Sequence, residues 1–178
     1  MTRRLILVGI AAAALAWLAW QWTARRNAPT PGVVADSTAA GVRSARLYFA
    51  STSGDSLVVE SRELLEAATL HERVAGLVAE LDRGPRGAGV AALPAGTAAL
   101  HVFLDDHGLL TLDLSRAFQQ GFRGGSGAEY LAVASLVRTL GANLPEVKRV
   151  LIVCGGRPIA TLGGHLPLDQ PLDVSDWP

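Results

Sequence analysis

Residues 5–22 form a run of 18 residues without one charged side chain, LILVGIAAAALAWLAWQW. As a helix rising about 1.5 Å per residue, this run would reach about 27 Å, close to the thickness of the hydrocarbon core of a bilayer. Arg3 and Arg4 precede the run, Arg25 and Arg26 follow it, and three of the four tryptophans gather near its C-terminal end. Flanking arginines and interfacial tryptophans are typical of membrane-spanning helices. The pattern predicts a transmembrane helix, so the remaining residues must supply any folded domain.

A cleaved signal peptide is the competing interpretation, because Ala14-Leu15-Ala16 is a small-x-small site behind an apolar core. An uncleaved signal anchor is favoured, since cleavage there would leave the apolar sequence WLAWQW at the new terminus. The only cysteine is Cys154, so no lipobox cysteine is present. The basic residues nearly balance across the span, and the α-amino group tips residues 1–4 toward the cytoplasm. We expect a single-pass protein of the cytoplasmic membrane with its domain on the extracytoplasmic (periplasmic or cell-wall) side.

Charge separates the chain into two parts. The sequence has 178 residues with 16 basic and 16 acidic side chains, and residues 1–45 hold five arginines against one acid, Asp36. The rest of the chain is therefore acidic, which argues against a nucleic-acid partner, since phosphate binding requires a clustered basic face. Residues 23–45 contain two prolines and many small residues without apolar periodicity, which predicts a flexible linker. A length of this order leaves room for one folded domain, expected to begin at Arg46.

The first half of this domain is predicted to be a strand pair followed by a helix. Residues 46–50 and 57–60 are short apolar runs separated by a Ser/Gly/Asp turn. Thr69 and Glu72 have the spacing of a capping box, in which each side chain binds a free backbone N–H of the first helical turn. Apolar residues then follow at helical spacing, and Gly84-Pro85 supplies the stop.

The second half is predicted to hold a hairpin, a helix and a second hairpin. Residues 99–104 and 110–114 flank the turn Asp105-Asp106-His107-Gly108. Ser126 and Glu129 repeat the capping-box spacing before the apolar stripe Tyr130, Val133, Ala134 and Val137. Strands are expected at 150–153 and 159–162 around a Gly-Gly turn. The expected fold class is α+β, with two helices packed on one face of a mostly antiparallel sheet.

Few residues offer chemistry. Cys154 lies at the end of an apolar strand and is expected to be a buried, unreactive thiol. The four histidines show no metal-ligand spacing, and Asp105 and Asp106 fit an ordinary turn better than a catalytic pair. The most suggestive segment is Arg123-Gly124-Gly125-Ser126, because backbone N–H groups at a helix N-terminus beside an arginine favour an anion. A flexible capping loop is the competing interpretation of that segment.

Ordered sequence pieces resemble the GerMN domain (sporulation and spore germination) family over residues 46–172, leaving 173–178 as a tail. They are LYF, LVVESREL, the helix end LDRGP, the loop LPAGT, the hairpin DDHGLLTLDLSRAF, the helix end LVRTL, and PEVKRV leading into IVCGGRPI. The resemblance implies a fold similar to ring-building motifs, a position outside the cytoplasmic membrane behind an anchor, and no established catalytic residues. Two departures are Cys154, where the family often has an acidic residue, and a slightly longer segment after Leu140.

Two functions remain open. The first is a non-catalytic, membrane-anchored envelope module that associates with itself or with other envelope proteins through a sheet edge or a helix face. The second is a protein that binds peptidoglycan or a small anionic ligand through Arg123, Gly124, Gly125 and Ser126. Neither requires a cofactor or a metal, and no enzymatic activity is expected.

Overall fold

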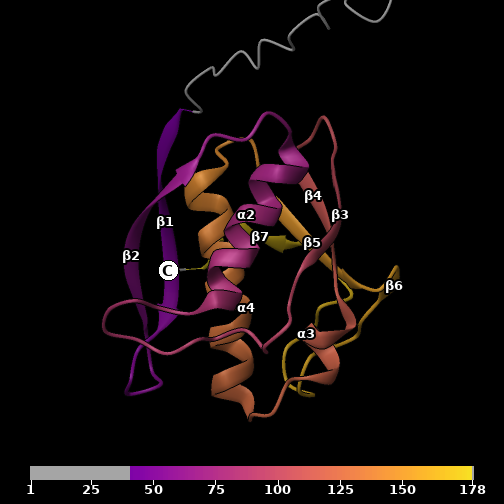
Figure 1. The fold of residues 1–178 in the computed structure, drawn as a ribbon. Coiled ribbons are helices and arrows are strands. Elements are labelled where there is room, and N and C mark those ends of the chain that lie inside the picture. The colour runs from indigo at the N-terminus through magenta and orange to yellow at the C-terminus, as the bar shows by residue number, and fades with distance from the viewer. Residues whose placement is uncertain (1–40, 178) are drawn as a thin grey trace, which may run out of the picture. The chain divides into compact units, whose positions relative to one another are not determined.

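The computed structural model describes residues 41–177, in which two helices pack between a strand pair and a larger sheet (Figure 1). Chain order alternates strand pairs with helices, which makes the fold α+β as predicted. The elements are β1 (Val42–Ala50), β2 (Leu57–Leu65), α2 (Leu70–Arg83), β3 (Ala99–Leu104), β4 (Leu109–Leu114), α3 (Arg116–Gln120), α4 (Ser126–Asn143), β5 (Arg149–Cys154), β6 (Arg157–Pro158), β7 (Leu172–Asp173) and the 3-10 turn η1 (Val174–Asp176).

The start of α2 has the geometry that its sequence predicts. The Thr69 hydroxyl accepts from the Glu72 N–H at 3.2 Å, and the Glu72 carboxylate accepts from the Thr69 N–H at 3.0 Å. The helix ends before Gly84, which has a φ of +83° that a side chain would strain. The predicted capping box and stop are therefore confirmed.

The predicted hairpin of β3 and β4 is also confirmed, with antiparallel pairing from Leu104 and Leu110 outward. The Asp105 carboxylate accepts from the N–H groups of His107 and Leu109 at 2.9 and 2.8 Å, which closes the turn. These bonds lower the pKa of Asp105, the Leu109 N–H having the largest effect. Asp105 therefore has a structural role in the turn.

The sheet arrangement corrects the prediction of one mostly antiparallel sheet with two helices on one face. β1 and β2 form a two-stranded antiparallel sheet of their own, and β3, β4, β5 and β6 form a second sheet that β7 joins by pairing with β5. β4 and β5 are parallel, because the chain returns between them through α3 and α4. The short helix α3 was not predicted.

The last predicted hairpin is wrong in part. Its second strand is only Arg157–Pro158, and residues 159–162 are not a strand. Ile159 and Leu162 are nevertheless buried, so the apolar run packs into the core without joining the ladder. Pro158 has no N–H to donate, which limits pairing at this point.

Helix α4 is the centre of the core. Every residue from Leu131 to Val137 is buried, so the helix is covered on nearly all sides and has no single apolar face. It contacts β1, α2 and η1. Tyr130, predicted to begin the apolar stripe, is instead 42% exposed and stacks on the Trp177 ring at 5.1 Å. A helix between two sheets needs apolar residues all round, which hides the expected periodicity.

Two boundaries differ from the prediction. β1 begins at Val42 rather than Arg46, and Ala45, placed in the linker, is fully buried. Residues of the expected tail 173–178 join the fold, since Trp177 is buried and its carbonyl accepts from Arg138 at 2.7 Å. The expected membrane span, residues 5–22, lies outside the described residues. Among residues 41–177, no helix has the length and apolar character to cross a membrane.

Candidate functional site

The predicted anion loop connects α3 to α4. Arg123 is exposed, and its guanidinium Nη1 donates to the carbonyls of Gln120 and Phe122 at 2.7 and 2.6 Å. Gly125 is the N-cap of α4 and Ser126 its first residue, with no side-chain bond to the free N–H groups of the first turn. The predicted capping box of Ser126 and Glu129 is therefore wrong.

A cavity of about 360 Å³ opens beside this loop. Arg123 is the one charged residue in its lining, and Gly124, Gly125 and Ser126 are not part of it. Its walls come from the hairpin turn, the loop after α2, the end of α3 and the start of α4: Ala50, Gly54, Val90, Ala91, Ala92, Leu93, Pro94, Gly121, Phe122, Ala128 and Leu131. The volume is at the lower end of the range for small-ligand pockets. Its chemistry suits an apolar group that carries one negative charge.

Glu129 has a different partner from the predicted one. Its side chain is fully buried, and its Oε1 accepts from the Thr161 hydroxyl at 2.5 Å and from the N–H groups of Leu162 and Gly163 at 3.0 and 2.9 Å. Its Oε2 accepts from the His165 N–H at 3.0 Å. Burial alone would raise the pKa of Glu129, but these hydrogen bonds lower it to about 2. Glu129 therefore binds the C-terminal loop to α4 as a carboxylate.

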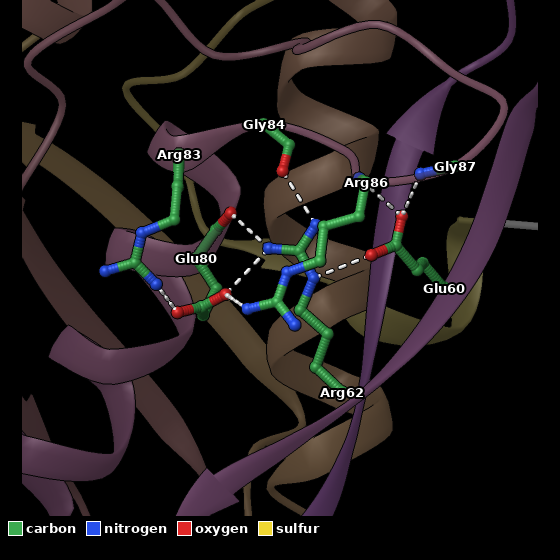
Figure 2. Close-up of polar contacts among 7 residues, drawn as sticks. All are labelled: Glu60, Arg62, Glu80, Arg83, Gly84, Arg86 and Gly87. Atoms are coloured by element: carbon green, nitrogen blue, oxygen red, sulfur yellow. Dashed lines mark hydrogen bonds and ion pairs between the residues drawn. The ribbon is translucent and has the colours of Figure 1, made fainter.

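A second buried charge connects β2 to α2 (Figure 2). Arg62 is 3% exposed, and its guanidinium binds the carboxylates of Glu60 and Glu80, each at 2.7 Å. It also donates to the carbonyl of Gly84 at 2.7 Å and lies over the ring of Phe49, 5.2 Å from its centre. Glu60 in turn accepts from the N–H groups of Arg86 and Gly87. The bond to Arg62 lowers the pKa of Glu60.

The outer edge of β1 is closed by side chains of α4. The Tyr48 N–H donates to the Thr139 hydroxyl at 3.1 Å, and the Tyr48 carbonyl accepts from the Ser135 hydroxyl at 2.5 Å. The Asn143 amide bonds both the N–H and the carbonyl of Arg46, at 2.9 and 2.7 Å. Ser135, Thr139 and Asn143 are four residues apart, so they lie along one side of the helix and replace a neighbouring strand. This polar spacing in the sequence was a usable signal that the prediction missed.

The outer edge of β2 has no such cover. Within residues 41–177, β2 pairs only with β1. Val59 and Leu65 on this strand are 59% and 71% exposed, and Val42 opposite Leu65 is 58% exposed. An exposed aromatic side chain, Phe103 at 67%, lies on β3, the outer strand of the larger sheet. An open strand edge offers unpaired backbone groups to another chain, and apolar side chains beside it add surface that such pairing would bury.

The other candidate residues have structural environments. Cys154 is buried, and burial raises the pKa of its thiol to about 11, so it is the packed, unreactive cysteine predicted. His101 is exposed and lies 3.1 Å from the buried Asp113. Among residues 41–177 there is no cluster of three potential metal ligands, and every buried side-chain nitrogen or oxygen there has a hydrogen-bond partner.

Comparison with known proteins places this fold. Residues 46–160, more than half of the chain, match the Germane family, described as sporulation and spore germination. No match is found among curated proteins.

Three solved structures share the fold. The tandem GerMN domains of the sporulation protein GerM from Bacillus subtilis give a TM-score of 0.61 at 19% identity, over 76% of this chain and 48% of that one. The first GerMN domain of the same protein gives 0.55 at 20% identity, over 74% and 97%. A Clostridium perfringens protein assigned as a lipoprotein gives 0.54 at 21% identity, over 76% and 90%. The chain therefore belongs to the Germane (GerMN-type) family of sporulation and spore germination.

Proposed function

We propose that the protein is a membrane-anchored, non-catalytic module of the cell envelope that acts by associating with proteins outside the cytoplasmic membrane. The carrying observation is the set of exposed apolar side chains on outer strands, Val42, Val59 and Leu65 on the small sheet and Leu100 and Phe103 on the larger one. Within residues 41–177, every buried side-chain nitrogen or oxygen already has a hydrogen-bond partner, so contact with another protein would be stabilised by covering these exposed apolar side chains.

The anchor in this proposal is the uncharged run of residues 5–22, followed by the short segment that leads to β1. The likeness to a protein assigned as a lipoprotein supports a position at a membrane surface. In this chain Cys154 is the sole cysteine and lies in a buried strand, so we assign the anchoring to residues 5–22.

Photo-crosslinking in intact cells tests the association. A photoreactive residue at Val59 or Phe103 of the full chain is expected to give discrete protein adducts, because both side chains are more than half exposed. The same residue at Asp169, exposed in the C-terminal loop, is the matched control. Adduct yields at Val59 and Phe103 no higher than at Asp169 would contradict the proposal.

A second function, binding of a cell-wall fragment or a small anion with an apolar part, is favoured by the cavity beside Arg123. Cosedimentation of the full chain with purified peptidoglycan tests it, comparing wild type with Arg123→Ala. Arg157→Ala, which removes another exposed arginine, is the control. Retention that is equally small for all three proteins would exclude this function.

A further inference from the structure

The free edge of β2 has a defined set of backbone groups. In an antiparallel pair, every second residue points its N–H and carbonyl groups toward the neighbouring strand, and the residues between them point these groups away from it. Arg46 and Tyr48 point their N–H and carbonyl groups away from β2, because those groups bind α4. Their cross-strand partners, Ser61 and Val59, therefore point the same groups away from β1. Toward the rest of residues 41–177, the odd-numbered residues of β2 therefore present an open row of backbone donors and acceptors.

This row lies clear of the network around Arg62. Successive side chains of a strand point to opposite faces, so Glu60 and Arg62 face α2 while Val59 and Ser61 face outward. The loop after α2 binds Glu60, on the inner face. β2 contains no proline, lysine or bulge, which are common devices that block an open edge, and its inward-pointing cation, Arg62, is paired with Glu60 and Glu80.

The outward face of the strand pair has apolar ends and a polar middle. The cross-strand pairs in order along it are Val42–Leu65, Ser44–Glu63, Arg46–Ser61 and Tyr48–Val59. This order is self-complementary. When a second copy lies antiparallel, each apolar end lies beside an apolar end, and Glu63 of one copy lies in the same cross-strand row as Arg46 of the other copy.

We propose that two copies of this chain pair antiparallel along the open edge of β2, with Val59 opposite Leu65 of the second copy and Ser61 opposite Glu63 of the second copy. The result is a four-stranded sheet with two-fold symmetry, which closes after two chains. This inference rests on the proposed association function and names one partner for it.

The side chains distinguish this register from its neighbours. In the proposed register the two exposed apolar residues of β2, Val59 and Leu65, cover each other. Arg46 lies in one cross-strand row with Glu63 of the second copy, with only the small Ser61 between them. If the register shifts by one pair in one direction, Ser61 lies opposite Ser61 of the second copy, and Val59 lies opposite the carboxylate of Glu63 of the second copy. A shift in the other direction puts Glu63 opposite its own copy, which like charges oppose.

Disulfide trapping in membranes of cells that express full-length chains tests the register. Hydrogen-bonded antiparallel partners have Cα atoms about 5.5 Å apart, within the range of a disulfide. Chains with Val59→Cys and chains with Leu65→Cys are expected to form a mixed disulfide when expressed together, and no disulfide when expressed singly. Ser61→Cys reports the shifted register, and Ala160→Cys, exposed in a distant loop, gives the background.

A charge-swap experiment tests the same contact without a covalent bond. In a dimer of Arg46→Glu chains alone, position 46 of each copy and Glu63 of the other copy are both negative. In a dimer of Glu63→Arg chains alone, Arg46 of each copy and position 63 of the other copy are both positive. Each variant is expected to weaken self-association about tenfold or more. Expressed together with different tags, the two variants restore both opposite-charge rows and are expected to copurify. A contact within one chain cannot produce that rescue, since each chain carries one swap.

Failure of this inference is separable from failure of the proposed function. A mixed disulfide no stronger than the Ala160→Cys background, or a dominant Ser61→Cys disulfide, overturns the β2 pairing. Copurification that the combined swaps do not restore overturns it as well. Capture of a different protein from Val59 or Phe103 in those same cells would leave the wider association function standing.

Discussion

Replacing Glu129 with glutamine is expected to lower the free energy of unfolding by about 3 kcal/mol at pH 7, since the pKa of Glu129 falls from its ordinary 4.5 to about 2 and each unit is worth about 1.4 kcal/mol. The contacts give the same order, because the amide N–H₂ would take the place of one carboxylate oxygen and face either the Leu162 and Gly163 N–H groups or the His165 N–H group. Leaving such groups unpaired in a buried site costs about 1 to 3 kcal/mol each.

The pH dependence follows from the direction of the shift. A carboxyl whose pKa is lower in the folded state stabilises the fold above its unfolded pKa of about 4.5, and this contribution is lost as the pH falls toward 2. The Glu129→Gln variant has nothing to titrate at this position. The stability difference between the wild-type protein and this variant should therefore shrink steadily as the pH falls below 4.5.

Urea denaturation of the full chain, followed by near-ultraviolet circular dichroism of the stacked Tyr130 and Trp177 rings, measures this difference. Glu146→Gln is the matched control, because Glu146 forms a half-exposed pair with Arg73 that is worth less than about 1 kcal/mol. A loss of under 0.5 kcal/mol (about the error of such a titration) for Glu129→Gln, or a loss that does not change with pH, would refute the reasoning.

Three further predictions concern other side chains of the fold. Arg62→Met leaves Glu60 and the Gly84 carbonyl without their guanidinium partner, while Glu80 keeps Arg83 and Arg86. It should cost about 1 to 3 kcal/mol in the same assay, whereas loss of an exposed surface cation costs under about 1 kcal/mol. Asn143→Ala should cost about 1 kcal/mol and speed hydrogen exchange of the Arg46 amide, and unchanged exchange would exclude the edge-closing role. Cys154 should react with a thiol reagent only after unfolding, so labelling of the native protein at the rate of a free thiol would contradict its burial.

The sequence predicts features that depend on neighbouring residues. The Thr69–Glu72 capping box and the Asp105 turn form within a few residues, so their spacing alone specifies them. The identical spacing of Ser126 and Glu129 fails, because donors more than thirty residues away in the C-terminal loop take the carboxylate. A local pattern contains no information about that competitor.

The division into two sheets was also beyond local pattern. Strand propensity predicts strands but not partners, and β1 finds α4 at its outer edge through Ser135, Thr139 and Asn143 instead of another strand. Of the predicted site, the structure brings Arg123 to a cavity and leaves Ser126 outside it. The sequence predicted association through a sheet edge or a helix face but did not single out β2. Whether a strand edge stays exposed depends on how distant elements pack, and the residue pattern of the strand does not specify that packing.

A domain outside the cytoplasmic membrane is the central requirement of this account, and labelling of Ala160→Cys in intact cells tests it most directly. Ala160 is exposed, and the native Cys154 is buried with a raised pKa, so the introduced thiol is the reactive one. A membrane-impermeant thiol reagent is expected to label intact cells as fully as lysed cells. Labelling that appears only after lysis would place the domain in the cytoplasm and contradict the account.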